Sequence, residues 1–229
     1  MRILFLITAR GGSKGIPGKN SKKLSGIPLI MHSVNIARCV ADDADICVST
    51  DSEEIISILA DNNLEVPFKR PDHLATDTAG SYDVILHAIR FYKNKGISYD
   101  AIMLMQPTSP FRKPEFIYDM INLFSPDLDM VVSVKECHEN PYFSMYEESI
   151  TGFLEKSKKG NFTRRQDAPK VYAYNGSLYL MNIRSLEEKP MNKFRRVRKY
   201  VMDEYYSVDI DTPVDWLLVE VLAKSEFIK

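Results

Sequence analysis

The segment ITARGGSKGIPGKN, residues 7–20, combines basic side chains and glycines directly after a short apolar run. Arg10, Lys14 and Lys19 can neutralise a triphosphate, because an arginine offers a planar fork and lysines act as point charges. A glycine-rich turn that follows a strand also presents backbone N–H groups to phosphate oxygens. The segment therefore predicts a phosphate-binding loop, and a solvated turn is the simpler alternative.

The glycine spacing in this loop excludes the two commonest phosphate-binding motifs. A Walker A loop has a glycine five positions before its Gly-Lys pair and a serine or threonine after the pair. Here Ser13 and Asn20 occupy those positions around Gly18-Lys19. The dinucleotide fingerprint GxGxxG is absent as well, because the glycines recur at 12, 15 and 18. The loop is of neither kind.

A second candidate site is the acidic pair Asp209 and Asp211 in VDIDTPVD. On extended chain, residues two apart place their side chains on the same face. Paired carboxylates suit Mg²⁺, which takes oxygen ligands and shares them with phosphates. The alternative is that one of the pair caps the helix that begins near Pro213. Asp215 is expected to be a first-turn charge that the helix dipole stabilises.

Further polar residues stand where buried segments end. Gln106 follows an apolar run, and ligands of open parallel sheets bind beyond the carboxyl ends of the strands. Its amide can read a base or a sugar, or it can simply be a polar strand terminus. Arg70 precedes Pro71 and is expected in extended chain. Ser81 opens a helical segment, as its N-cap, as a ligand contact or as both.

These residues must be positioned by strands and helices that alternate along the chain. Apolar runs predict strands at 2–8, 44–50, 100–106, 129–136, 176–183 and 195–202. Helical spacing and end signals predict helices at 27–40, 51–63, 81–96, 113–124 and 214–224. Such alternation predicts a parallel sheet covered by helices. The irregular, polar stretch at about 138–172 predicts a functional or interface-forming insertion within one domain spanning 1–229.

The composition limits the partners and the compartment. The chain has 229 residues, is 45% hydrophobic and carries a formal net charge of −1. A general binder of nucleic acid or of membrane surfaces is more basic than this, so we expect neither partner. Three scattered cysteines without zinc spacing indicate thiols of a reducing compartment. No run approaches the ~20 apolar residues of a membrane span, which predicts a soluble cytoplasmic protein.

The motifs, taken in order, resemble those of the CMP-sialic acid synthetases, the acylneuraminate cytidylyltransferases. The matching segments are ITARGGSKGIPGKN, KLSGIPLI, VSTDSEEI, KRP, DTAGSYDVI, LMQPTSPFR, RRQDAP, YNGSLYL and VDIDTPVD. This resemblance implies a Rossmann-like three-layer α/β/α sandwich of the nucleotide-sugar transferase type, with a small dimerisation arm at 138–172. It also implies an enzyme that joins CTP to an acidic nine-carbon 2-keto sugar, releases pyrophosphate, uses Mg²⁺ and forms a homodimer.

The resemblance assigns roles to individual residues. Those implied in catalysis are Lys19, Arg10, Asp209 and Asp211, with the two aspartates as Mg²⁺ ligands. Those implied in nucleotide binding are Arg10, Gly12, Ser13, Lys14, Lys19, Asn20, Arg70 and Ser81. Those implied in sugar binding are Gln106, Arg165, Asn175 and Tyr179. Arg165 belongs to the arm and is expected near the active site of its own or of the partner subunit, whereas Tyr179 can equally be a core residue.

Alternatives remain at this point. The sugar can be legionaminate or a related acid. 3-Deoxy-manno-octulosonate enzymes share the IPGK element, but Asn20 replaces their usual proline. A purine nucleotide instead of CTP also stays open. A non-catalytic nucleotide-binding protein on the same fold is a further alternative, although such a protein has no need of two metal carboxylates such as Asp209 and Asp211.

Overall fold

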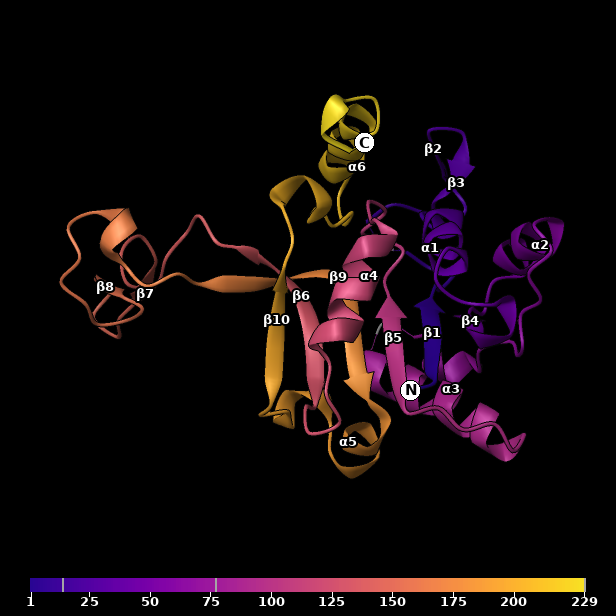
Figure 1. Cartoon of the computed structure of the whole chain (residues 1–229). Coiled ribbons are helices and arrows are strands. Elements are labelled where there is room, and N and C mark those ends of the chain that lie inside the picture. Colours follow the sequence, from indigo (N-terminus) through magenta and orange to yellow (C-terminus); the bar gives the residue numbers. More distant parts are fainter. Residues whose placement is uncertain (14, 77, 229) are drawn as a thin grey trace.

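A mixed six-stranded sheet forms the centre of the molecule, in the order β10-β6-β9-β5-β1-β4 (Figure 1). The computed structural model describes residues 1–13, 15–76 and 78–228. The central strands are β1 (Ile3–Thr8), β4 (Ile46–Ser49), β5 (Ala101–Met105), β6 (Met130–Glu136), β9 (Tyr172–Asn182) and β10 (Val197–Val201). Two short hairpins pair β2 (Lys23–Leu24) with β3 (Ile27–Pro28) and β7 (Tyr146–Glu148) with β8 (Leu154–Lys156).

Strand β9 corrects the expectation of a fully parallel sheet. It pairs antiparallel with both β5 and β6, whereas the remaining pairs of the central sheet are parallel. The chain leaves the carboxyl end of β6 at residue 136 and re-enters the sheet at residue 172 from the same edge. A parallel β9 would require the chain to cross back to the opposite edge first. The long insertion therefore dictates the direction of the strand that follows it.

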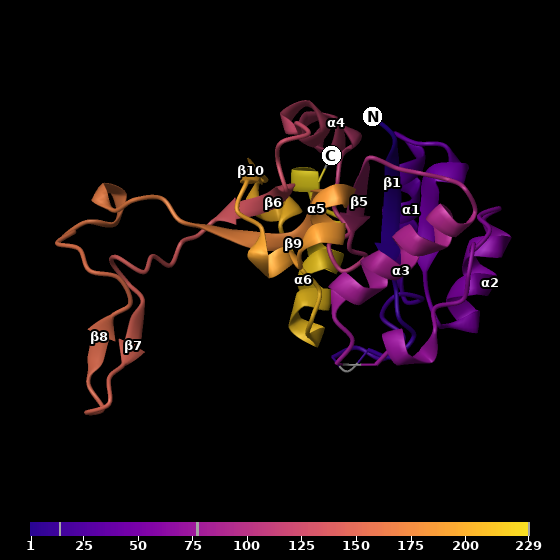
Figure 2. The same cartoon turned by 90° about the horizontal axis from the view of Figure 1, so that it is seen from below.

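Helices cover both faces of the sheet and make the three layers that were predicted (Figure 2). Helices α1 (Leu29–Arg38), α2 (Glu53–Asp61) and α4 (Pro114–Leu123) pack on one face. Helices α3 (Ser81–Asn94) and α5 (Ile183–Glu188) pack on the other. Successive residues of β1 alternate between the two cores, with Phe5 in the first and Leu6 in the second. The fold prediction is confirmed.

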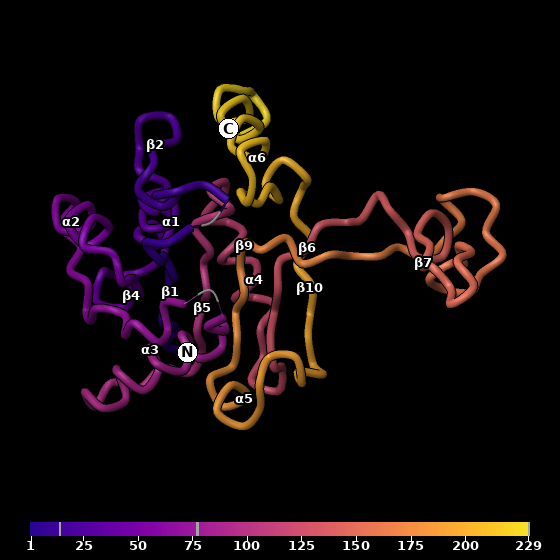
Figure 3. Tube along the Cα trace, turned by 180° about the vertical axis from the view of Figure 1, so that it is seen from behind, coloured from indigo at the N-terminus to yellow at the C-terminus, as the bar shows by residue number. Residues whose placement is uncertain are grey.

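Helix α6 (Pro213–Leu222) lies across the edge of the sheet where the parallel strands end (Figure 3). Its Trp216 and Val219 share a third core cluster with Leu24 of β2 and Leu29 at the start of α1. The helix begins with a capping box in which Thr212 and Asp215 bind each other's backbone N–H groups. Thr212 is thus the cap, and neither aspartate of the acidic pair has that role.

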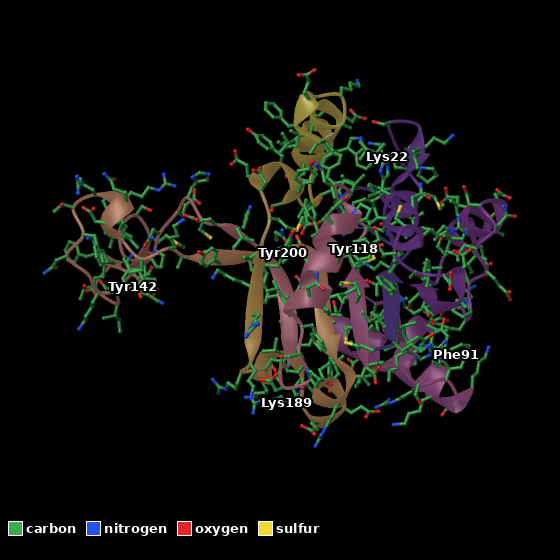
Figure 4. The ribbon with its side chains drawn as sticks, viewed as in Figure 1. Lys22, Phe91, Tyr118, Tyr142, Lys189 and Tyr200 are labelled. Atoms are coloured by element: carbon green, nitrogen blue, oxygen red, sulfur yellow. The ribbon has the colours of Figure 1, made fainter. Side chains whose placement is uncertain are left out.

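The stretch between β6 and β9 forms an arm that extends away from the sheet (Figures 1 and 2). The arm carries the β7–β8 hairpin and a small contact of its own, in which the rings of Tyr142 and Phe162 meet edge to face with centroids 6.0 Å apart. Figure 4 shows Tyr142 within the arm. Within the described ranges, no helix has the length and apolar character that crossing a bilayer demands.

Asp129, just before β6, connects several segments of the chain through hydrogen bonds and an ion pair. Its carboxylate accepts hydrogen bonds from the backbone N–H groups of Arg195 and Arg196 and from the Ser185 hydroxyl, and it pairs with Lys189 at 2.9 Å. Burial alone would raise the pKa of Asp129, but these donors together hold it well below its usual value. The side chain therefore stabilises the fold above about pH 4, and this contribution is lost as the pH falls toward the lowered pKa.

Asp129→Asn is expected to lower the free energy of unfolding at pH 7 by about 2 kcal/mol, because an amide leaves buried donors without their charged acceptor. Urea denaturation at pH 7 and at pH 3 measures this difference. The loss should shrink at the lower pH, where the wild-type carboxylate is closer to protonation. An equal loss at both pH values would contradict the charge-based explanation.

Candidate active site

A cavity of about 440 Å³ opens at the carboxyl ends of β1 and β5, where the sequence predicted ligand binding. It is lined by Thr8, Arg10, Ser13, Gly15, Lys19, Asn20, Arg70, Leu74, Thr76, Ala79, Ser81, Val84, Gln106, Pro107, Thr108 and Asp211. Residues far apart in the sequence, from both ends of the chain, thus face one space. The predicted site residues among them are Arg10, Ser13, Lys19, Asn20, Arg70, Ser81, Gln106 and Asp211.

The loop after β1 is held in place by contacts with neighbouring segments. The Gly11 N–H donates to the Asp51 carboxylate at 2.9 Å, and the Asn20 amide donates to the Arg10 carbonyl at 3.1 Å. Asn20 is buried, and its Oδ1 has no hydrogen-bond partner among the described residues. A buried acceptor without a partner in a cavity wall is suited to a donor group of a ligand. The neighbouring Ser52 is the N-cap of α2, which leaves the Asp51 carboxylate for this contact with the loop.

Gly12, a predicted nucleotide contact of this loop, is not among the described residues that line the cavity. Gly12 is exposed, and a Cβ there would meet no protein atom within 4 Å, so the protein itself does not require a glycine. Lys14 lies outside the described residues. Gly15 differs from Gly12, because a Cβ at that position would overlap the backbone carbonyl of Asp211. The close approach of the loop backbone to the Asp211 carbonyl therefore requires a glycine at position 15.

Lys19 joins the amino-terminal loop to the carboxyl-terminal acidic turn. Its side chain is 9% exposed, and its Nζ donates to the Ile210 carbonyl and lies 3.5 Å from Asp211 Oδ1. The Asp211 side chain is 76% exposed and points into the cavity region. A fixed cation and an accessible carboxylate therefore stand side by side at the cavity wall, 192 residues apart in the sequence.

Asp209 is half-buried beside Thr108 and Gly176 and does not line the cavity. Burial is the main cause that raises the pKa of its carboxyl group; a hydrogen bond from Thr108 acts against this rise, and the nearby Asp211 adds to it. Its Oδ1 is buried and has no hydrogen-bond partner among the described residues. A buried carboxylate oxygen without a donor fits a cation, so the acidic pair meets the requirement for Mg²⁺.

The acidic pair lies in a segment from Ser207 to Thr212 that is not part of a strand. Beyond the effect of burial, the two carboxylates are close enough for Asp211 to raise the pKa of Asp209. Among the described residues, no group of three or more acidic, histidine or cysteine side chains could hold a metal ion. A Mg²⁺ ion at Asp209 and Asp211 would therefore take its remaining ligands from phosphates and water, as this ion commonly does.

Arg70, Ser81 and Gln106 complete the cavity wall on the side of β4 and β5. Arg70 is 5% exposed and donates to the Ser49 hydroxyl at 3.0 Å; burial is the main cause that lowers its pKa. Ser81 is the first residue of α3, and Gly80 occupies the cap position, so the N-cap expectation for Ser81 is wrong. The side chain of Ser81 is exposed to the cavity and free of a capping role.

Of the predicted sugar contacts, Gln106 lines the cavity and Asn175 does not. Asn175 is 3% exposed. Its amide oxygen accepts from the Ser133 hydroxyl and the Ser177 N–H, and its amide nitrogen donates to the Ser207 hydroxyl and the Met202 sulfur. These contacts use every hydrogen-bonding position of its amide, so the structure gives Asn175 a structural role and corrects the expected sugar contact.

Tyr179 and Arg165 lie away from the cavity wall in a single chain. Tyr179 packs against the second core cluster and lies edge to face with Tyr174. Burial is the main cause that raises its pKa, and the nearby Asp209 adds to this rise. Arg165 lies on the arm and lines a separate cavity of about 920 Å³ at the base of the arm.

Thr108 and Arg112 support the site without having been predicted to do so. The Thr108 carbonyl accepts from the Ile210 N–H at 2.9 Å, which links the loop after β5 to the acidic turn. Arg112 is buried and donates to the Ser177 and Ser33 hydroxyls and to the Gln106 carbonyl. The sequence signal was the position of both residues just beyond a buried strand, where loops commonly carry function.

Gly176 makes room for Asp209 and provides a test of that carboxylate. A Cβ on Gly176 would lie 2.7 Å from Asp209 Oδ2, at a backbone φ of +75°. Gly176→Ala is expected to displace the carboxylate and weaken Mn²⁺ binding in the presence of CTP by about tenfold. Gly96→Ala is the matched control, because Gly96 has the same φ of +75° but nothing within 4 Å. Electron paramagnetic resonance of bound Mn²⁺ measures both; equal effects would contradict a specific role for Gly176.

Known proteins resemble this chain over almost its full length. A family model described as cytidylyltransferase matches residues 4–226. CMP-N,N'-diacetyllegionaminic acid synthase of Legionella pneumophila is 32% identical over 97% of this chain and 96% of that protein. N-acylneuraminate cytidylyltransferase of Streptococcus agalactiae serotype V is 33% identical over 96% of this chain and 52% of that protein.

Solved structures show the same fold at lower identity. The CTP complex of CMP:2-keto-3-deoxy-manno-octonic acid synthetase superimposes with a TM-score of 0.72 at 16% identity, over 97% of this chain and 98% of that one. The 4-diphosphocytidyl-2C-methyl-D-erythritol synthase of Anaerococcus prevotii gives a TM-score of 0.66 at 13% identity, over 98% and 99% of the two chains. At these identities the likeness concerns the fold.

Proposed function

This chain belongs to the cytidylyltransferase family, and from that premise we propose that it joins CTP to a sialic-acid-like, nine-carbon 2-keto sugar acid. The products are the CMP-sugar and pyrophosphate. The observation that carries the proposal is the meeting of Lys19 and Asp211 at one cavity, which Arg10 and Arg70 also line. Cations at this density suit a triphosphate, and the accessible carboxylate suits the metal that accompanies it.

The reaction is an in-line attack of the anomeric hydroxyl of the sugar on the α-phosphate of CTP. Chemistry of this kind depends on positioning and on neutralising charge. Lys19 and Arg10 hold the departing pyrophosphate, and Arg70 and Ser81 hold the cytidine portion. Gln106 orients the sugar at the end of β5. Asp209 and Asp211 would hold Mg²⁺, which when bound supplies charge neutralisation and polarises oxygen ligands.

We further propose that the enzyme works as a homodimer built through the arm. The arm extends from the body of its own chain and carries Arg165 (Figure 2). In the dimer, Arg165 of the partner subunit supplies a guanidinium fork for the sugar carboxylate.

The described cysteines Cys39, Cys47 and Cys137 form no disulfide, which agrees with a cytoplasmic location.

A pyrophosphate-release assay tests the reaction. With Mg²⁺ and CTP, we expect release to depend on an added acid from a panel of N-acetylneuraminate, N,N'-diacetyllegionaminate and 3-deoxy-manno-octulosonate. ATP, GTP and UTP at the same concentrations are the nucleotide controls, because the side chains of the cavity should discriminate among bases. Release with a purine nucleotide in place of CTP would contradict the cytidylyl assignment. A preference for the eight-carbon acid would contradict the proposed sugar class.

A further inference from the structure

A second cavity, here named the side cavity, has a volume of about 490 Å³ and lies next to the cavity that is proposed to hold CTP. Its polar lining consists of His73, Thr76, Thr78, Asp83, His87 and Arg90. Leu74, Thr76 and Ala79 line both cavities, so the segment that begins with the 3₁₀ turn η2 (Asp72–Leu74) separates the two spaces. The proposed reaction gives no role to the histidines or to the arginine of the side cavity.

Arg90 supplies the side cavity with a positive charge. It is exposed on helix α3, where its neighbour in the chain is Phe91, labelled in Figure 4. Among the residues that the structure describes, no carboxylate forms an ion pair with its guanidinium and no acceptor forms a hydrogen bond with it. Asp83 contributes a carboxylate to the same lining, but it lies two helical turns earlier, about 10 Å along the helix axis. The planar fork of Arg90 is therefore available to a ligand.

His87 has unused hydrogen-bonding capacity in the wall of the side cavity. Its ring packs edge to face on Phe68, with centroids 4.7 Å apart, and its buried Nδ1 has no hydrogen-bond partner among the described residues. Burial is the main cause that lowers the pKa of His87, and the charges of His73, Arg70 and Arg90 add to this effect. The imidazole thus lies in a region of positive charge. An anion in the side cavity would relieve the repulsion among these groups.

The donors around the side cavity come from two segments of the chain. His73 belongs to η2, whereas His87 and Arg90 are three residues apart on α3 and therefore share one helix face. Thr76 and Thr78 add hydroxyls whose oxygens are 3.2 Å apart. A guanidinium, two imidazoles and two hydroxyls around one space suit the oxygens of a tetrahedral anion. A metal ion does not fit, because no group of three or more acidic, histidine or cysteine side chains among the described residues could hold one.

We propose that the side cavity is a binding site for a phosphate-type oxyanion, which Arg90 holds with its guanidinium fork and which His73 and His87 bind from η2 and from α3. The bound anion then connects η2, which also borders the cavity proposed for CTP, to the helix. Inorganic phosphate and the phosphate group of a small ester share this chemistry. The site is additional to the proposed transfer reaction and does not depend on it.

Histidine side-chain NMR of the whole protein tests the site. The chain has four histidines, and none is among the described residues that line the cavity proposed for CTP, so their signals report on the side cavity rather than on the phosphate loop. On titration with inorganic phosphate at constant ionic strength, we expect the His73 and His87 signals to move with one dissociation constant. The signals of His32 and His138 should stay in place.

Glycerol 3-phosphate is titrated in the same way, and tighter binding than that of phosphate would identify the ester as the preferred form. Unmoved His73 and His87 signals with both probes, or equal movement of all four histidines, would overturn the proposal.

Sulfate measures the contribution of the imidazoles, because it remains a dianion between pH 6 and pH 8, whereas phosphate changes its charge there. Anion binding favours the protonated form of His87, so affinity is lost as the pH rises through the pKa of the bound imidazole. The charged groups around His87 are Asp83 and Arg90 on α3, His73 on η2 and Arg70 beside β4. We expect sulfate to bind about fivefold more tightly at pH 6 than at pH 8. A dissociation constant independent of pH would overturn the imidazoles as ligands.

A charge-matched pair of variants gives an independent measure. Arg90→Gln is expected to weaken phosphate binding at least about tenfold, because it removes a charge-assisted contact. Lys93→Gln removes the same charge from the same helix and is the control, since Lys93 pairs with Glu187 at 2.8 Å and is not among the described residues of the side cavity. Equal dissociation constants for the two variants would overturn the site. Both variants should keep the wild-type kcat and KM for CTP, so failure of the anion site is distinguishable from failure of the proposed reaction.

Discussion

Asp211→Asn is expected to lower kcat for CMP-sugar formation by about 10³-fold while CTP still binds. Among the described residues, the Asp211 carboxylate is the acidic group that lines the cavity, and its side chain is 76% exposed. An amide of the same size keeps the shape but loses the charge that would hold Mg²⁺ against the phosphates. Binding of CTP should survive in part, because Lys19, Arg10 and Arg70 remain to hold the nucleotide.

A matched carboxylate separates the metal role of Asp211 from a structural one. Asp215 lies four residues later and accepts from the backbone N–H groups of Asp211 and Thr212 in the capping box. Asp215→Asn is therefore expected to lower the free energy of unfolding by about 1 kcal/mol, and with it the melting temperature. Most of kcat should remain. Pyrophosphate release, calorimetric CTP binding and thermal unfolding distinguish the two variants. Wild-type turnover in Asp211→Asn would remove Asp211 from the proposed metal site.

Much of the site was predictable because its residues follow buried strands. The loop after β1, Gln106 after β5 and Arg70 in the extended segment beside β4 all stand at the carboxyl edge of a parallel arrangement. The end of a strand can be predicted where an apolar run stops at polar or glycine-rich sequence. In such a sheet the carboxyl ends of the strands lie at one edge, so residues that follow different strands lie close together. Their proximity can therefore be predicted from the strand ends alone.

The residues that were misplaced depend on geometry that apolar patterns do not encode. Asn175 looks like a ligand contact in the sequence, yet the register shift of β9 against β6 near Ser133 turns its amide inward. Asp209 and Asp211 lie near enough to interact, but of the two only Asp211 lines the cavity, because the turn before α6 is irregular. The direction of β9 followed from the arm, and a long insertion gives no local signal of where it returns the chain.

The arm shows a different limit, because the role proposed for it involves a second chain. Its basic run and apolar tip were visible in the sequence only as an irregular polar insertion. In the structure, the tip residues Ile150 and Phe153 are exposed and Arg165 stands apart from the cavity. A segment that is packed by another subunit has no intramolecular pattern to reveal it. The exposed side chains of the arm suggest a contact surface only once the fold shows that the arm extends away from the sheet of its own chain.

Lys19→Met is expected to lower kcat/KM for CTP by about 10²-fold, chiefly through a higher KM and weaker inhibition by pyrophosphate. Methionine keeps the length of the apolar stem but cannot donate to the Ile210 carbonyl or neutralise phosphate charge. Some loss of stability, about 1 kcal/mol, should accompany the unpaired carbonyl. Inhibition by CMP should change far less than inhibition by pyrophosphate, because Lys19 is assigned to the departing group.

Lys22→Met is the matched control for Lys19, because both lysines belong to the same segment but face different surroundings. The Lys22 ammonium lies 4.0 Å from the centre of the Trp216 ring, outside the cavity lining (Figure 4). Its replacement should cost about 0.5 kcal/mol of stability and leave kcat/KM for CTP unchanged. Steady-state kinetics with varied CTP and added pyrophosphate compare the two variants. Equal kinetic constants for Lys19→Met and the wild type would show that the loop does not hold the phosphates, since a buried ammonium beside Asp211 would then have only a structural role.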